Sequence, residues 1–233
     1  EGDSTVKSQS SLGAFVSSPV KERGAMEDST VSRAPRLLMI SGAAGAGKST
    51  LATNIAVELG FDRIAGSDTI REVLRTNTTP NSNPALHRST FSSGITGEAV
   101  TDWLDASAAV ESGIEAVIAR SRREGMDLII EGAHVIPSNR ILIDWRNEGG
   151  VALGLTLTIE NEEVHRDRIV ERESNSHRGS ARYLAAFERI REIQSSQITR
   201  AKGAGWKIVD THLHKEIPER VRQWFDEEWY TLR

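Results

Sequence analysis

The chain has 233 residues, of which 38% are hydrophobic, and this length suits one large domain or two small ones. It contains no cysteine, which excludes a disulfide scaffold, a cysteine-based zinc site and a thiol nucleophile. The net charge of −4 argues against broad electrostatic binding to nucleic acid, and no apolar run is long enough to span a membrane. We therefore expect a globular, cytoplasmic protein without a nucleic-acid or membrane partner.

The first 35 residues differ in texture from the rest of the chain. They are rich in serine and show almost no apolar periodicity. Because such a segment buries too little surface to offset the entropy of ordering, we predict a mobile tail over residues 1–35 and one domain over residues 36–233. The chain opens with Glu1 rather than Met, which is consistent with a trimmed piece of a longer protein.

Apolar runs and helical patterns alternate after the tail. Residues 36–41 predict a buried strand, and residues 48–59 predict a helix. A weaker strand is expected over residues 61–65 and a short helix over residues 68–75. The polar residues 76–94 then predict a long loop, and a loop of that length in a compact domain is usually functional or disordered.

The second half of the chain continues the alternation of helices and strands. The remaining predicted elements are a helix from Val100 to Gly125, a strand over 126–131, a short helix near 141–145, a strand over 152–159, helices over 161–172 and 181–201, a strand over 206–209 and a helix that begins near Pro218. This order predicts a three-layer α/β fold with a five-stranded, mostly parallel sheet. Ligands of such sheets bind at the carboxyl ends of the strands.

The strongest motif joins the first strand to the first helix. Residues 42–49 read GAAGAGKS and match the pattern GxxxxGK[ST], whose backbone N–H groups cradle phosphates. Lys48 would place a positive charge on the transferred phosphate, and the Ser49 hydroxyl would ligate Mg²⁺. The predicted ATP-binding residues of this loop are Gly42, Ala43, Ala44, Gly45, Ala46, Gly47, Lys48, Ser49 and Thr50.

The class of nucleotide chemistry is narrowed by motifs that the sequence lacks. There is no Asn-Lys-x-Asp motif of GTPases and no LSGGQ-like signature of transport ATPases, which leaves the small-molecule kinases. In that class Asp68 would accept the proton of the acceptor hydroxyl, and Arg71 would hold an anionic acceptor. The alternative is that Asp68 caps a surface helix and pairs with Arg71.

Two acids flank the predicted strand over residues 126–131. Glu131 ends the strand and would hold a metal-bound water or position the acceptor; the alternative is a solvated acid at a strand end. Asp127 begins the strand and would lie at the wrong end of the sheet for chemistry. His134 follows Glu131 and is a candidate acceptor contact.

The arginine-rich stretch over residues 160–200 supplies the candidate lid. Its acids balance its arginines, so most of these charges are expected on solvated, salt-bridged helices. Arg168 and Arg172 form an RxxxR motif similar to the one that starts the lid of adenylate-kinase-like kinases. That similarity implies that Arg168 stacks on adenine and Arg172 reaches the transferred phosphate, with Arg178 and Arg182 closing from a helical lid around residues 168–182.

Taken together, these motifs resemble the 2-phosphoglycerate kinase family over roughly residues 36–210. The resemblance rests on the segments GAAGAGKST (42–50), GSDTIRE (66–72), LHRST (86–90), IIEGAHVIP (129–137), LTI (157–159), EEVH (162–165), RYL (182–184) and RIREIQ (189–194). It implies a P-loop kinase fold and ATP- and Mg²⁺-dependent phosphorylation of a small hydroxy-acid phosphate. It also implies that His87, Arg88 and Ser89 bind the acceptor, whereas His165, in the middle of a predicted helix, is expected to be structural or solvated.

Several alternatives for the acceptor stay open. Relatives of this family are similar in sequence yet act on mevalonate 3-phosphate, and plant relatives are tied to inositol phosphates. Members of the archaeal type also carry an additional N-terminal domain, where this chain has the Ser-rich residues 1–35. A kinase of a polynucleotide or sugar hydroxyl and a non-catalytic ATP-sensing module are further alternatives.

Overall fold

The computed structural model describes residues 33–174 and 180–231. The chain divides into two units, residues 1–33 and residues 34–233, and the described secondary structure lies in the second. The predicted tail is almost entirely outside the described residues, and so is Arg178. Among the described helices, none is both long and apolar enough to cross a membrane.

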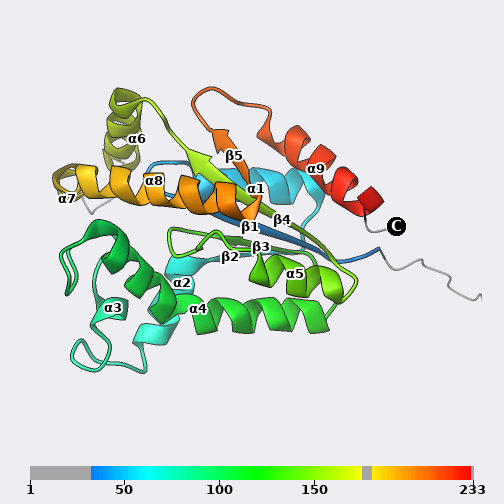
Figure 1. The fold of residues 1–233 in the computed structure, drawn as a ribbon, viewed down its shortest axis with the longest axis horizontal. Helices are drawn as coiled ribbons and strands as arrows, with labels where there is room; N and C mark the ends of the chain where they lie inside the picture. Colours follow the sequence, from blue (N-terminus) through cyan, green and yellow to red (C-terminus); the bar gives the residue numbers. More distant parts are fainter. Residues whose placement is uncertain (1–32, 175–179, 232–233) are drawn as a thin grey trace, which may run out of the picture. The chain divides into compact units, whose positions relative to one another are not determined.

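A five-stranded sheet forms the centre of the folded unit (Figure 1). The strands run in the order β2-β3-β1-β4-β5, and every pairing between neighbours is parallel. In chain order the strands are β1 (Arg36–Gly42), β2 (Arg63–Gly66), β3 (Leu128–Glu131), β4 (Val151–Thr158) and β5 (Lys207–Asp210). The predicted α/β fold with a parallel sheet is confirmed.

Helices pack on both faces of the sheet. In the described part of the chain they are α1 (Lys48–Leu59), α2 (Ser67–Arg75), α3 (Pro84–His87), α4 (Ala99–Arg123), α5 (Arg140–Asn147), α6 (Glu162–Ser174), α7 (Ala181–Ala185), α8 (Phe187–Ala204) and α9 (Ile217–Thr231). Helices α1 and α9 cover one face, and α4, α5 and α8 cover the other. Because successive side chains of a strand point to opposite faces, the inner strands β1, β3 and β4 contribute side chains to both cores.

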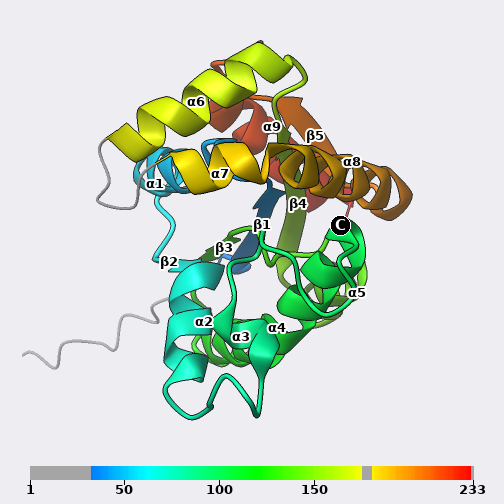
Figure 2. The same cartoon turned by 90° about the vertical axis from the view of Figure 1, so that its left-hand side faces the viewer.

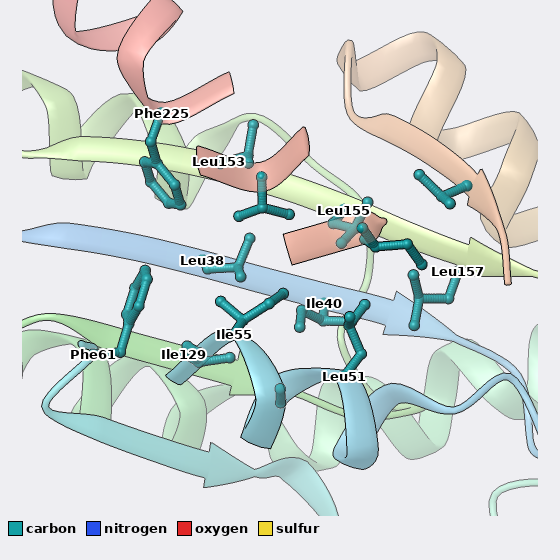
Figure 3. Close-up of a cluster of buried hydrophobic side chains, with 14 of the residues drawn as sticks. Leu38, Ile40, Leu51, Ile55, Phe61, Ile129, Leu153, Leu155, Leu157 and Phe225 are labelled. Carbon is teal, nitrogen blue, oxygen red and sulfur yellow. The ribbon is translucent and has the colours of Figure 1, made fainter. Parts of the chain in front are cut away.

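Strand β1 shows this division most clearly. Leu38 and Ile40 join the core under α1 and α9, which Figure 3 shows with Phe61 and Phe225 at one end. The alternate residues Leu37 and Met39 join the core under α4 and α5. All seven residues of β1 are buried, as the apolar run in the sequence predicts for a central strand.

A buried ion pair holds the amino ends of β1 and β3. The Asp127 carboxylate accepts the Arg36 backbone N–H at 2.6 Å and the Arg36 side-chain Nε and Nη2 at 2.9 and 2.6 Å. The Arg36 guanidinium also lies over the Phe61 ring, 4.3 Å from its centroid. Asp127 is therefore a structural acid at the opposite end of its strand from Glu131, in agreement with its predicted position.

Apart from shifted boundaries, the structure departs from the prediction in two segments. The loop over residues 76–94 contains the short helix α3, which Pro84 starts and Asn83 caps by accepting the Leu86 backbone N–H at 3.4 Å. The single helix predicted over residues 181–201 is divided into α7 and α8 at Ala186, whose N–H bonds to Tyr183 O, three residues back. Since neither Gly nor Pro marks this break, the sequence gives no local signal for it.

Candidate active site

The candidate site lies along the carboxyl ends of β1, β2 and β3. Figure 2 faces this edge and shows α6 and α7 on one side of it and α2 and α3 on the other. A cleft of about 340 Å³ lies here, within the size range of small-molecule sites. The cleft is lined by Ala44, Lys48, Ser49, Asp68, Arg71, Glu72, Arg75, His87, Arg88, Ser89, Thr90, Phe91, Glu131, Gly132, Ala133, Arg172, Arg182 and Tyr183.

The phosphate-binding loop takes the backbone path that its glycines allow. Gly45 and Gly47 both have φ of +81°, a left-handed conformation that favours glycine. At Gly42 a Cβ would come within 2.8 Å of the Leu157 backbone oxygen, so β4 approaches too closely for a side chain. A second cleft, about 610 Å³ in volume, adjoins the loop and is lined by Gly45, Gly47, Lys48, Ser49, Thr50, Arg168, Glu171 and Arg172.

Lys48 is the first residue of α1 and lines both clefts. Its Nζ donates to the Ala43 backbone oxygen at 2.7 Å, a contact that a phosphate oxygen could replace. Burial lowers the pKa of Lys48 to about 8, and the Glu131 carboxylate opposes this shift. A polyanion beside Nζ would restore the fully charged ammonium, so the site favours an anionic ligand.

Ser49 and Glu131 bring two hard oxygen atoms together. The Ser49 hydroxyl donates to Glu131 Oε1 at 3.0 Å, although the two residues come from α1 and β3. Oxygen donors of this kind suit Mg²⁺, which takes few protein ligands and completes its shell with phosphate oxygens and water. Among the described residues no group of three or more acids or histidines could hold a metal ion without such help. The pair therefore fits a magnesium ion that arrives with a nucleotide.

The other side of the cleft is built on α2 and on residues 76–98, the segment between α2 and α4 that includes α3 and is called the acceptor loop below. Asp68 lies in the first turn of α2 with its side chain 69% exposed, 3.9 Å from Arg71 Nη2. Arg71 also donates to the Arg88 backbone oxygen at 3.2 Å. Arg88 is oriented by Asp105, whose carboxylate accepts from Nη2 at 2.9 Å. The structure therefore brings Asp68, Arg71 and Arg88 together, as the sequence predicts.

His87 and Ser89 line the same cleft, on either side of Arg88. The His87 Nε2 lies 3.0 Å from the Thr78 hydroxyl, and the Ser89 hydroxyl accepts the Phe91 N–H at 3.5 Å. Both side chains are thus placed by contacts within the long loop, and each keeps atoms at the cleft surface.

His134 does not line either cleft, in contrast to the prediction that it contacts the acceptor. It is only 2% exposed, and its two ring nitrogens lie 3.0 Å from Ser67 Oγ and 2.8 Å from Thr90 Oγ1. Burial lowers its pKa to about 4, so the ring is neutral at physiological pH. His134 instead joins Ser67 at the start of α2 to Thr90 of the acceptor loop, and its Nδ1 lies 3.9 Å from Asp68 Oδ1.

The side of the cleft formed by α6 and α7 presents arginines around an aromatic ring. The guanidiniums of Arg172 and Arg182 lie 6.0 and 4.6 Å from the centroid of Tyr183, and Arg182 Nη2 donates to the Tyr183 hydroxyl at 2.9 Å. Tyr183 meets Phe91 of the acceptor loop edge-on, with centroids 6.4 Å apart. The Arg168 guanidinium donates to the hydroxyl and to the backbone oxygen of Thr211, both at 3.1 Å.

Sequence reasoning missed several residues that line the cleft. Tyr183 and Thr90 stand inside the motifs RYL and LHRST, but no role was predicted for them. Glu72 and Arg75 pair on the exposed face of α2, with Arg75 Nη1 2.7 Å from Glu72 Oε2. Glu72 follows Asp68 by four residues and Arg75 follows Glu72 by three, and these spacings could have indicated that the residues continue the same helix face.

Comparison with known proteins places the chain in a family. Residues 37–222 match the family described as AAA domain. The chain is 35% identical over 184 residues to the 2-phosphoglycerate kinase of Methanocaldococcus jannaschii, an alignment that covers 76% of this chain and 59% of that protein. It is 36% identical over 198 residues to the 2-phosphoglycerate kinase of Pyrococcus horikoshii, covering 82% and 64%. The chain thus spans about three fifths of the length of these curated relatives.

Solved structures agree with the fold. The shikimate kinase of Acinetobacter baumannii, in complex with shikimate, aligns with a TM-score of 0.50 and 13% identity. The alignment covers 83% of this chain and 94% of that chain, and at this identity it shows a shared fold alone. The predicted P-loop kinase fold is confirmed. The chain belongs to the AAA domain family, and its resemblance to the 2-phosphoglycerate kinases is confirmed.

Proposed function

We propose that this protein is a kinase that transfers the γ-phosphate of ATP, with Mg²⁺, to the hydroxyl of a small phosphorylated acid similar to 2-phosphoglycerate. The observation that carries the proposal is one continuous cleft. It joins Lys48 and Ser49 of the phosphate-binding loop to Asp68 and to arginines from α2, the acceptor loop and both helices of the opposite wall. The two named relatives, both 2-phosphoglycerate kinases, support the same acceptor class.

The charge of the cleft supports an acceptor with more than one negative group. The whole chain carries a net charge of −4, yet the described cleft lining holds six basic side chains against three acidic ones. The basic residues are Lys48, Arg71, Arg75, Arg88, Arg172 and Arg182. Guanidinium groups bind carboxylates and phosphates through paired N–H donors, so this set suits a phosphorylated acid better than a neutral sugar.

Each part of the site has a role in phosphoryl transfer. The loop N–H groups and Lys48 would hold the β- and γ-phosphates, while Ser49 and Glu131 would hold Mg²⁺, which supplies charge neutralisation between the phosphates. Asp68 would accept a hydrogen bond from the acceptor hydroxyl and take its proton as the new O–P bond forms and ADP leaves. Arg71 and Arg88 would orient the acceptor. Arg168 would cover the adenine, and Arg172 and Arg182 would neutralise the developing charge.

The proposal is tested by acceptor-dependent release of ADP. The protein is given ATP and Mg²⁺ with 2-phosphoglycerate, 3-phosphoglycerate, mevalonate phosphates or inositol phosphates in turn. We expect strong stimulation by 2-phosphoglycerate or a close analogue. The Lys48→Ala variant should lower this rate by about 10²-fold or more, because it removes a charge that acts on the transferring phosphate. ATP binding without stimulation by any acceptor would instead support the sensing module.

A further inference from the structure

His165 of α6 contacts the phosphate-binding loop directly, although no role at the site follows from the motifs. Its side chain is fully buried, and its Nε2 lies 2.7 Å from the backbone oxygen of Ala44. The two residues are separated by 121 positions in the chain, so this contact is formed only by the folded domain. The sequence left open whether His165 is structural or solvated, and its burial shows that it is not solvated.

The neighbours of the ring determine which nitrogen carries the proton. A carbonyl oxygen can only accept, so the hydrogen bond to Ala44 requires the proton on Nε2. The Nδ1 atom faces Arg191 Nη1, a donor, at 3.4 Å, and Arg191 is itself fixed by the Ile159 and Glu160 backbone oxygens at 2.6 and 2.9 Å. His165 is thus held as a neutral ring whose donor points at the loop.

The hydrogen bond fixes the direction of a peptide group in the loop. In a trans peptide the carbonyl of one residue and the N–H of the next point in opposite directions. When His165 holds the Ala44 carbonyl, the N–H of Gly45 is turned away from the imidazole. Gly45 lines the cleft beside Lys48, and its φ of +81° allows this orientation.

One face of α6 both packs on the phosphate-binding loop and lines the adjoining cleft. A Cβ on Gly45 would meet Ile169 Cγ1 at 2.9 Å and His165 Cδ2 at 3.4 Å, so these two side chains pack directly on the loop. Arg168 and Arg172 line the adjoining cleft. Positions 165, 168, 169 and 172 are three or four residues apart and therefore lie on the same side of the helix. Helix α6 thus fixes where the arginines lie relative to the loop.

We propose that His165 is a positioning residue for nucleotide binding, which holds the Ala44 carbonyl so that the Gly45 N–H is presented to a phosphate oxygen. This inference rests on the proposed ATP site but not on the identity of the acceptor. It assigns a role to the EEVH segment, whose other described residues begin α6. The ring acts through the loop backbone and does not itself touch the reacting atoms.

The test compares nucleotide affinity in matched variants of the full chain. Binding of a non-hydrolysable ATP analogue with Mg²⁺ is measured by titration calorimetry for the wild type, His165→Leu and His165→Gln. We expect His165→Leu to weaken binding about tenfold, the scale of one hydrogen bond. We expect His165→Gln to retain most of the affinity, because an amide N–H can still donate to Ala44. The KM for the acceptor should change less than the KM for ATP in both variants.

A stability control separates positioning from general destabilisation. Ile118→Ala removes a buried side chain of α4 from a core that contains no residue of the loop 42–49. It should lower the melting temperature without weakening nucleotide binding. Arg191→Met gives a second readout that leaves His165 in place. It frees Nδ1 to carry the proton, so affinity should fall, but by less than in His165→Leu.

The outcomes distinguish this inference from the proposed function. If the wild type binds the nucleotide and both His165→Leu and Arg191→Met bind it equally well, the positioning role is wrong while the ATP site stands. If Ile118→Ala loses as much affinity as His165→Leu, the effect is one of stability and the inference is also wrong. If the wild type binds no nucleotide, the proposed function fails together with this inference.

Discussion

Asp68 is the residue on which the chemistry of the proposed reaction depends most directly. It is the second residue of α2, just after the carboxyl end of β2, and it lines the cleft together with Lys48 and Arg71. The N-cap of α2 is Gly66, with no side-chain capping bond, so the predicted capping role of Asp68 is wrong and its pairing with Arg71 is the alternative that remains. An acid that only pairs with Arg71 would be silent in catalysis, whereas a proton acceptor would act on the rate of the chemical step.

The two roles of Asp68 are separated by the variant Asp68→Asn, which keeps the size of the side chain. We expect kcat to fall by about two to four orders of magnitude, because an amide cannot take the proton of the acceptor hydroxyl. The affinity for ATP should change little. Steady-state kinetics with both substrates varied provides the measurement. An unchanged kcat would reduce Asp68 to an acid that only pairs with Arg71.

The direction of the His134 side chain could not be predicted from the sequence. Its place after Glu131, beyond the end of β3, correctly puts its backbone near the site. The direction of the ring, however, is decided by Ser67 and Thr90, whose hydroxyls lie against its two nitrogens. Gly132 makes room for this arrangement, since a Cβ there would come within 1.8 Å of Ser67 Oγ. Contacts of this kind exist only after folding.

At the scale of elements, Asp102 of α4 connects three segments around the acceptor loop. Its buried carboxylate accepts the Gly94 N–H at 2.6 Å, the Thr96 hydroxyl at 2.8 Å and Arg189 Nη2 of α8 at 3.0 Å. Its burial would raise the pKa, but the hydrogen bonds from Gly94, Thr96 and Arg189 outweigh burial and lower it to about 2. The charged carboxylate thus holds the end of the acceptor loop between α4 and α8.

This pKa predicts a pH dependence of stability. Because the folded pKa is below the ordinary value of 3.8, the contribution of Asp102 is fully present above about pH 4 and is lost as the pH falls toward 2. Asp102→Asn should therefore lower the unfolding free energy at pH 7 by on the order of 2 kcal/mol, with little difference from the wild type near pH 2. Urea denaturation at several pH values measures this.

The control for Asp102 is Asp105→Asn, one turn further along α4. The Asp105 side chain is 55% exposed and pairs with Arg88, so its removal should cost less than about 1 kcal/mol at any pH. A stability difference between wild type and Asp102→Asn that stays constant from pH 7 to pH 2 would contradict the account of Asp102.

Element types follow from the sequence more readily than element boundaries. Apolar runs predict β1, β3 and β4 most clearly, because a strand buried on both faces has few polar residues to interrupt it. The edge strand β2 is only partly buried, and its pattern in the sequence is weaker. The predicted strand over residues 61–65 is displaced to Arg63–Gly66, since Phe61 packs on Phe225 of α9 rather than in the sheet. The break between α7 and α8 is likewise imposed by packing, where Tyr183 turns toward Phe91.

At the scale of the whole molecule, the order of the strands brings the motifs together. Strand β1 lies between β3 and β4, so the phosphate-binding loop is flanked by Glu131 on one side and the segment that leads to α6 on the other. The sequence predicts that the sheet is parallel and that the site is at its carboxyl edge. The strand order β2-β3-β1-β4-β5 cannot be predicted from local sequence patterns, because it depends on pairing between strands that are far apart in the chain.

The charge of the molecule is also distributed in a way that composition conceals. The chain as a whole carries a net charge of −4, while the folded chain gathers arginines from α2, α6, α7 and the acceptor loop around one cleft. We propose that this cleft carries a phosphate from ATP to a small phosphorylated acid.

This transfer can be observed by following the phosphate itself. Phosphorus NMR of a mixture of the protein, ATP, Mg²⁺ and 2-phosphoglycerate resolves the reactants and any new phosphate ester. We expect a second phosphate ester on the acceptor that grows in step with ADP and is absent with Lys48→Ala. ADP that appears together with inorganic phosphate alone, at the same rate with and without acceptor, would contradict this proposal.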